Sequence, residues 1–235
     1  KEHIWYLFQY DCGQNWTDNR TGGQPYFSFR YFVEHGQLDR MRVLKESLLA
    51  VNRNLNKNLS SWFAGMFTAL SPNIEEQLTL QPEIFAVLSA PHSRPVNIIL
   101  GLLKNLCTHP QFQVEEFLNQ TSVLFASDVK AIHQNTLAVL HKLAKERKEH
   151  RDAICCVAAQ GLMSREESTQ SKIVKLIQMY GETASTTLKE VLSIYTETML
   201  ANTKKDLKAY LGNNEPEDSA SFTYEPILPI IREDN

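Results

Sequence analysis

The sequence of 235 residues has few cysteines and no long apolar run. Its apolar runs, such as residues 98–103, are far shorter than the roughly 20 residues of a membrane-spanning helix. None of the four cysteines forms a C-x-x-C pair, and the adjacent Cys155 and Cys156 are unsuited to binding one metal ion or to a mutual disulfide. We therefore expect buried free thiols in a reducing cytoplasm, with no membrane anchor and no metal site.

A basic excess and a signal segment are also missing. The formal net charge is −3, which argues against a general binder of nucleic acid or anionic membranes. The chain starts at Lys1 with neither an initiator Met nor an apolar leader, so we expect a piece of a longer polypeptide or a processed chain.

Motifs for catalysis are absent from the sequence. There is no G-x-S-x-G nucleophile turn and no H-E-x-x-H zinc motif, and Gly22-Gly23 lacks the Lys-Ser or Lys-Thr that completes a phosphate-binding loop. His133 and His141 lie two helical turns apart, too far to hold one ion together. We therefore predict a protein that is not an enzyme and that uses no cofactor.

The sequence is rich in apolar residues at helical spacing. They recur every three or four positions from residue 38 onward, first at Leu38, Met41, Leu44, Leu48 and Val51. Ser164 with Glu167 matches a capping box, in which each side chain binds an amide at the helix start. The polar residues 12–24, with several Gly, Asn and Asp, indicate a loop.

An internal recurrence of 37 positions is the most specific feature. Four sets of mostly apolar residues follow at this spacing: Trp62, Phe63, Met66 and Ala69; Ile99, Leu100, Leu103 and Leu106; Thr136, Leu137, Leu140 and Leu143; Ile173, Val174, Ile177 and Tyr180. A second helix shows the same step: Phe117 and Leu118, Ile154 and Cys155, Val191 and Leu192. Each unit is thus two helices long, and stacked pairs would bury each other's apolar stripes. The alternative is that amphipathic helices of similar length coincide by chance.

The order of several short motifs resembles a known family. Residues 36–40 (GQLDR) are followed by residues 47–50 (SLLA), Trp62-Phe63 and residues 70–75 (LSPNIE), and then by helices at 96–106 and 129–143. This order resembles a bacterial family catalogued as a domain of unknown function, whose members are large proteins with a HEAT-like or armadillo-like helical core. The resemblance covers about residues 36–181. It implies a cytoplasmic bacterial repeat protein, a fragment of a larger chain, with no known catalytic residues.

Cations cluster at the end of one predicted helix and in the following turn: Lys142, Lys145, Arg147, Lys148 and Arg151. One interpretation is that they complement the negative end of the helix dipole on a solvated face. The other is a docking patch for an acidic protein partner or for nucleic acid. The interleaved Glu146 and Glu149 weaken the nucleic-acid version because they repel phosphates.

Residues 212–235 combine acidic and apolar side chains. Six acidic residues accompany a single basic one, Arg232, a composition typical of a disordered linker. However, the segment also contains large apolar residues: Phe222, Tyr224, Ile227, Leu228, Ile230 and Ile231. We therefore expect it to lie along the last helices or on a neighbouring copy of the chain.

Together these features predict an all-α fold, a HEAT-like α–α superhelix built as a solenoid of antiparallel helix pairs. We divide the chain into residues 1–25, a helix and an irregular loop; residues 26–211, the repeat domain; and residues 212–235, an extended tail. The leading hypothesis for function is a non-catalytic cytoplasmic scaffold that binds a protein partner. A nucleic-acid binder that uses the basic cluster and a purely structural spacer in a larger multidomain chain remain alternatives.

Overall fold

The fold is all-helical in the computed structural model, which describes residues 2–21, 26–53 and 55–211, and no strand occurs in these ranges. The α-helices are α1 (Gln14–Thr21), α2 (Phe27–Glu34), α3 (Arg40–Val51), α4 (Lys57–Ala69), α5 (Ile74–Thr79), α6 (Gln81–Ala86), α7 (Ser93–Leu106), α8 (Val114–Phe125), α9 (Lys130–Glu146), α10 (Arg151–Ala159), α11 (Glu167–Tyr180), α12 (Thr186–Ile194), α13 (Ala201–Asp206) and α14 (Lys208–Leu211). Short 3-10 helices are η1 (Glu2–Phe8), η2 (Val87–Ser89), η3 (Lys148–His150) and η4 (Gln160–Met163).

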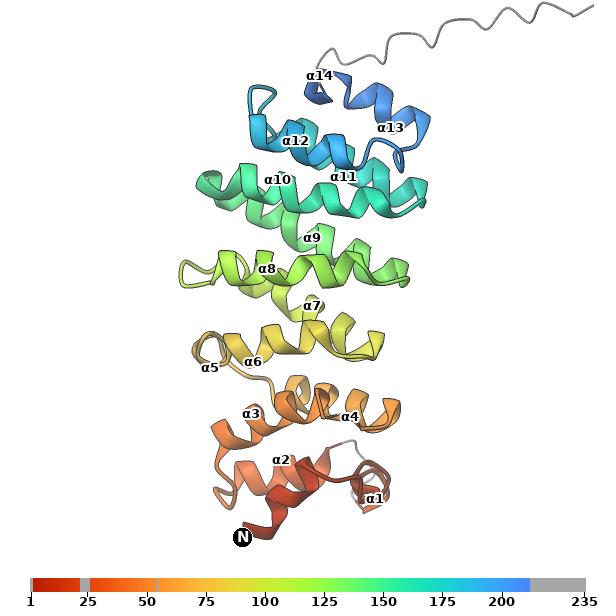
Figure 1. The fold of residues 1–235 in the computed structure, drawn as a ribbon. Helices are drawn as coiled ribbons and strands as arrows, with labels where there is room; N and C mark the ends of the chain where they lie inside the picture. The colour runs from red at the N-terminus through yellow and green to blue at the C-terminus, as the bar shows by residue number, and fades with distance from the viewer. Residues whose placement is uncertain (1, 22–25, 54, 212–235) are drawn as a thin grey trace, which may run out of the picture.

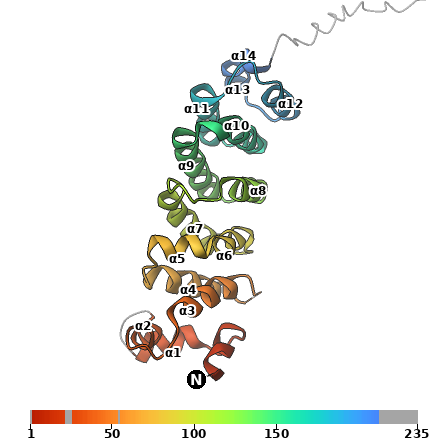
Figure 2. The ribbon, with the colours of Figure 1, turned by 90° about the vertical axis from the view of Figure 1, so that its left-hand side faces the viewer.

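The helices form an elongated stack with two rows, and η1 and α14 lie at its opposite ends (Figures 1 and 2). In the first row α4 contacts α7, α7 contacts α9, and α9 contacts α11. In the second row α6 contacts α8, α8 contacts α10, and α10 contacts α12. Between the rows, α9 packs on both α8 and α10, and α10 packs on α11. This arrangement is compatible with the predicted α-solenoid.

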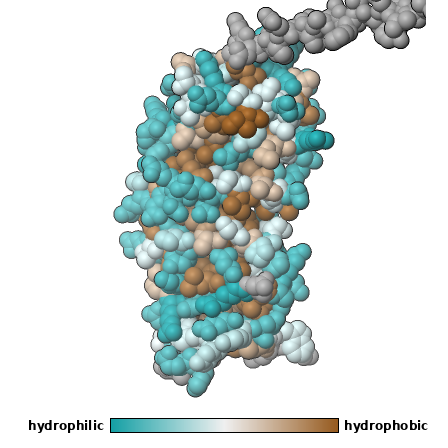
Figure 3. Space-filling model, viewed as in Figure 1, coloured by the Kyte–Doolittle hydropathy of each residue, from teal (hydrophilic) through white to brown (hydrophobic). Residues whose placement is uncertain are grey.

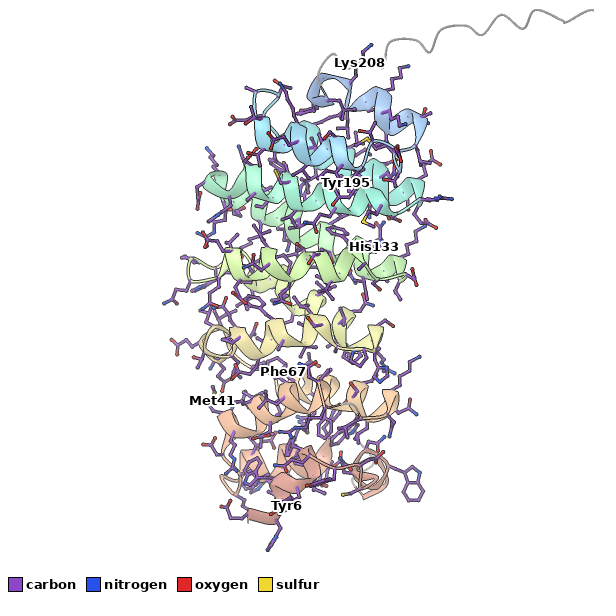
Figure 4. All side chains as sticks on the ribbon, in the orientation of Figure 1. Tyr6, Met41, Phe67, His133, Tyr195 and Lys208 are labelled. Carbon is purple, nitrogen blue, oxygen red and sulfur yellow. The ribbon has the colours of Figure 1, made fainter. Side chains whose placement is uncertain are left out.

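The core lies between the two rows and between successive layers, where side chains fill the space (Figure 4). The four sets of residues spaced by 37 positions fall in α4, α7, α9 and α11, the successive helices of the first row. All of them are buried except Ala69 and Tyr180, which are half-buried. Thr136, the polar member, is fully buried, and its hydroxyl donates to the Ile132 carbonyl at 2.8 Å. Burial of the hydroxyl is thus accompanied by a hydrogen bond within the helix.

The N-terminal region is more regular than the sequence predicts. Residues 14–21, part of the expected loop, form α1. The buried side chain of Gln14 stabilises the start of this helix by donating to the carbonyls of Leu7 at 2.6 Å and Tyr10 at 3.1 Å. Trp5 and Phe8 of η1 belong to the same hydrophobic core as the later helices. The polar composition misled the prediction because α1 has no apolar stripe and depends on this tertiary contact.

The predicted capping box at Ser164 and Glu167 is wrong. Helix α11 begins two residues later than that pattern requires, with Glu166 as its N-cap and no side-chain cap. A capping box does form at α5, where the Asn73 side chain accepts from the Glu76 amide at 2.9 Å and Glu76 Oε2 accepts from the Asn73 amide at 2.8 Å.

The predicted extended tail, residues 212–235, lies outside the described residues. The last described helix, α14, contacts α12 and α13. The face of the stack formed by the second row carries hydrophobic patches interrupted by hydrophilic side chains (Figure 3).

Candidate functional site

Three members of the predicted basic cluster bind helix-end carbonyls. Lys142 Nζ donates to the Lys104 carbonyl in the last turn of α7 at 2.7 Å. Arg147 Nη2 donates to the His109 carbonyl at 2.6 Å, just beyond the same helix. Such carbonyls have no partner within their own helix and attract cations. These two side chains therefore join α9 to the layer before it.

Arg151, the first residue of α10, is also engaged. Its Nε donates to the Ala144 carbonyl in the last turn of α9 at 2.8 Å. Its guanidinium lies 5.1 Å from the centre of the Tyr180 ring, and the His141 ring packs edge-on against the same tyrosine at 5.4 Å. Tyr180 thus holds a cation and an imidazole at the meeting point of α9, α10 and α11.

The other two members, Lys145 and Lys148, are exposed and make no hydrogen bond or ion pair with any residue of the described ranges. Glu146 and Glu149 are exposed beside them. The structure therefore divides the predicted cluster between cations bound to backbone carbonyls and cations that face solvent among acids.

A groove between α9 and α11, of about 430 Å³, brings further cations together. Its floor is apolar and is made by Leu137, Ala138, Leu176 and Met179, of which Leu137 and Leu176 are buried and Met179 is 60% exposed. Its rim is formed by Gln134, His141, Lys142, Lys172 and Lys175. We call this depression the lysine groove. It contains one residue of the predicted site, Lys142, and adds Lys172 and Lys175, which the sequence analysis did not single out.

The charged residues that line the lysine groove are all lysines, and no acidic residue lines it. The Lys172 amine donates to Gln134 Oε1 across the two helices. Lys175 is exposed and has no hydrogen-bond or ion-pair partner within the described part of the chain. An apolar floor with a cationic rim suits a segment that carries both apolar and acidic side chains. The spacing of 38 positions between Gln134 and Lys172, and between His141 and Met179, was the signal in the sequence that could have paired these residues.

Two other depressions have mixed charge. One, of about 560 Å³, contains Arg147 and His150 together with Glu115, Glu116 and Glu149. The other, of about 420 Å³, contains Lys130 and Arg165 together with Asp128 and Glu166. In the second, Lys130 Nζ lies 2.7 Å from Glu166 Oε2, and this hydrogen bond lowers the pKa of the Glu166 carboxyl. Neither depression has the single sign of charge found in the lysine groove.

His133 lines the second of these depressions and is only 5% exposed. Neither ring nitrogen has a hydrogen-bond partner, and the ring packs at 5.8 Å from that of Phe125. His141, two turns later on the same helix, contacts Tyr180 instead. The two histidines that the sequence analysis compared therefore lie in different environments.

The thiols of the stack are held in their protonated form. Burial raises the pKa of Cys155 to about 12 and that of Cys107 and Cys156 to about 11. Cys12 is exposed, and all four cysteines are free. Within the described ranges, no group of three or more His, Cys, Asp or Glu side chains is placed to hold a metal ion. No helix in these ranges is long and apolar enough to cross a membrane.

Comparison with known proteins gives one match. The family model described as Domain of unknown function (DUF6493) matches residues 1–131, which is more than half of the chain. The match starts before the motifs at residues 36–75 and ends near the start of α9, so the lysine groove lies almost wholly beyond it. No curated protein and no solved structure matches the chain.

Proposed function

The chain belongs to the family of the domain of unknown function DUF6493, and we propose that it is a non-catalytic helical-repeat scaffold that binds a protein partner in the lysine groove. The partner contributes a segment with both apolar and acidic side chains. As the sequence resemblance implies, we further propose a HEAT-like repeat fold in a cytoplasmic bacterial protein.

Polar contacts between layers support the repeat. Asn135 Nδ2 donates to Asn97 Oδ1 at 2.7 Å, and Lys104 Nζ donates to Asn135 Oδ1 at 2.7 Å, so α7 and α9 are linked along the outside of the first row. The Lys130–Glu166 ion pair and the Lys172–Gln134 hydrogen bond link α9 to α11 in the same way. Residues 31 to 38 positions apart form these links. Similar separations in successive layers are expected when one helix pair repeats along a stack.

The observation that carries the docking proposal is the combination of an apolar floor with a rim that has cations and no acids. Water leaves the floor when an apolar side chain covers Met179 and Ala138, the floor residues that are still exposed to solvent, and this burial favours binding. Lys172 and Lys175 then attract carboxylates of the bound segment, which adds specificity and speeds association. The basic cluster is a weaker candidate because Arg147 and Arg151 already bind backbone carbonyls.

Photocrosslinking from inside the lysine groove tests the proposal. The full chain carries a benzoylphenylalanine in place of Met179, and it is irradiated in a bacterial lysate. The crosslinked peptides are then sequenced. We expect a peptide segment rich in acidic and apolar residues. Its yield should fall when Lys172 and Lys175 are both changed to Glu, and it should fall with rising salt.

The matched control is the Lys145→Glu, Lys148→Glu variant, which makes the same charge change outside the groove and should leave the yield unchanged. Products that disappear on nuclease treatment would replace the protein-scaffold proposal with nucleic-acid binding. A yield that is equal in both variants, or no product at all, would refute docking in the lysine groove and favour the structural spacer.

A further inference from the structure

We propose that the partner segment in the lysine groove is extended and runs across the helices of the stack, from α9 over α11 to the lysines of α13. This inference rests on the proposed function, because it takes the lysine groove to be the docking site of an acidic, apolar segment of another protein. It adds a second contact area, Lys204 and Lys205, and the direction in which the segment lies.

Charge is divided unevenly between the two rows of helices. Helices α9, α11 and α13 follow one another in contact toward the C-terminal end of the stack (Figure 2). They contain seven lysines and three acidic residues. Helices α8, α10 and α12 of the second row contain two basic and four acidic residues. An acidic segment is therefore attracted to the side formed by α9, α11 and α13.

The acidic residues of these three helices lie only at helix ends. Glu146 and Asp206 are the last residues of α9 and α13, and Glu167 is the first residue of α11. Lys142 lies four positions before Glu146, and Lys172 lies five positions after Glu167, so each acid is about 6–8 Å away along its helix. A segment that runs along the helices therefore meets a carboxylate at either end of the groove, which repels its own acidic residues.

Across the helices the surface continues with cations. Helix α13 packs on α11, and Gln178 Nε2 of α11 donates to the Asp206 carbonyl of α13 at 3.2 Å. Gln178 lies one turn after Lys175, and both are exposed. Lys204 and Lys205 precede Asp206, are exposed, and have no hydrogen-bond or ion-pair partner among the described residues. Two amines of α13 are thus available beside the α11 rim of the groove, and they outnumber the one carboxylate of that helix.

The spacing of the helices suits an extended segment. Packed helices lie about 8–10 Å apart, so the path from α9 to α13 is roughly 20 Å long. An extended chain advances about 3.3 Å per residue, so about six residues cover this path. Along α9, however, the groove is lined only from Gln134 to Lys142, which is about 12 Å of helix. A helical segment that lay along the groove would therefore use little more than two turns.

Fluorescence anisotropy with the full chain tests the direction. The probe is a fluorescein-labelled peptide of four Glu-Leu-Pro repeats, in which proline prevents a helix while Glu and Leu supply acidic and apolar side chains. The groove reversal is Lys172→Glu with Lys175→Glu, and the α13 reversal is Lys204→Glu with Lys205→Glu. We expect each reversal to weaken binding of the peptide about tenfold, because two attractive charges become repulsive.

The matched control is the Lys145→Glu, Lys148→Glu variant. Lys145 continues the line of His141 along α9, so a segment that runs along this helix would reach it. The dissociation constant of the control should stay within about twofold of that of the parent chain, because charges away from the bound segment are screened. A peptide with Lys in place of its Glu at one end should bind the α13 reversal more tightly than the original peptide does, which an unfolded variant could not do.

Each remaining outcome overturns the inference. If the α13 reversal has no effect but the groove reversal weakens binding, the segment stays within the groove and only this inference fails. If the control weakens binding instead of the α13 reversal, the segment lies along α9, and again only this inference fails. Equal binding after the groove reversal removes the lysine groove as the site, so the proposed function fails as well. No binding of the peptide also overturns the inference, and capture by the probe at Met179 then decides separately whether the proposed function stands.

Discussion

The ion pair between Arg40 and Glu76 should stabilise the stack measurably, and replacing Glu76 with Gln tests this. Arg40 Nε lies 2.7 Å from Glu76 Oε1, and Nη2 lies 3.1 Å from Oε2, so the pair is bidentate. Nη2 also donates to the Leu70 carbonyl at 2.9 Å, at the end of α4. One guanidinium thus joins the start of α3, the end of α4 and the start of α5.

The magnitude follows from these contacts. The Glu76 side chain is 13% exposed and that of Arg40 is 38% exposed, so solvent weakens the pair only in part. A hydrogen bond to a charged group contributes about 1.5–3 kcal/mol, and exposure of Arg40 reduces the estimate for Glu76→Gln to about 1–2 kcal/mol. For a chain of this size, the loss corresponds to a fall in Tm of about 2–8 °C.

The dependence on pH gives a second, independent readout. The hydrogen bond from Arg40 lowers the pKa of the Glu76 carboxyl below its ordinary value, and the Asn73 amide lowers it further, while burial opposes them. A lowered pKa in the folded state contributes stability above the ordinary pKa, and this stability is lost as the pH falls through the lowered value. The difference in Tm between the parent chain and Glu76→Gln should therefore be full at pH 7 and shrink below about pH 4.

The assay is thermal unfolding followed by circular dichroism, with Glu75→Gln as the control. Glu75 lies in the same first turn of α5 but is exposed and belongs to neither the capping box nor the ion pair. Its replacement should change the stability by less than about 0.5 kcal/mol. A double-mutant cycle with Arg40→Met isolates the coupling between the two side chains. Equal effects of the two glutamine variants, or a difference that grows as the pH falls, would refute the reasoning.

Three further predictions concern close packing, a buried imidazole and the thiols. Gly65→Ala should lower the Tm, because the added Cβ would overlap the hydroxyl oxygen of Tyr26 and lie 2.9 Å from its Cζ. Adding Tyr26→Phe to this variant should restore part of the loss. An unchanged Tm in the Gly65→Ala variant would contradict this packing. His133→Leu should raise stability by about 1–2 kcal/mol in thermal unfolding, because neither ring nitrogen has a partner, whereas a lower Tm would mean that the imidazole is hydrogen-bonded. Iodoacetamide at pH 8 should add one label to the native chain, at Cys12, because burial keeps thiols such as Cys155 protonated. Mass spectrometry counts the labels. Rapid labelling of a second cysteine would be inconsistent with this prediction.

Apolar spacing predicted the helical class correctly but failed where the local signal was polar. The residues spaced by 37 positions fall in the first-row helices, because a helix that buries one face has apolar residues at regular spacing in the sequence. Helix α1 was missed because Gln14 secures it through carbonyls of η1, a contact that composition does not record. The cap of α11 was misplaced because Ser164 and Glu167 fit the pattern but the extended N-cap backbone belongs to Glu166. The predicted partner and the absence of catalysis stay predictions.

The sequence by itself determined that the apolar-patterned stretches after residue 38 are helices, which of their faces are apolar, and that negative charge concentrates in residues 212–235. These properties are local, so they follow from residue type and spacing. The tertiary structure alone decided which cations remain available. Arg147 and Arg151 bind backbone carbonyls of other segments, whereas Lys172 and Lys175 meet Lys142 around an apolar floor. Those contacts depend on how one helix pair is displaced and rotated against the next, and no single stretch of sequence specifies that geometry.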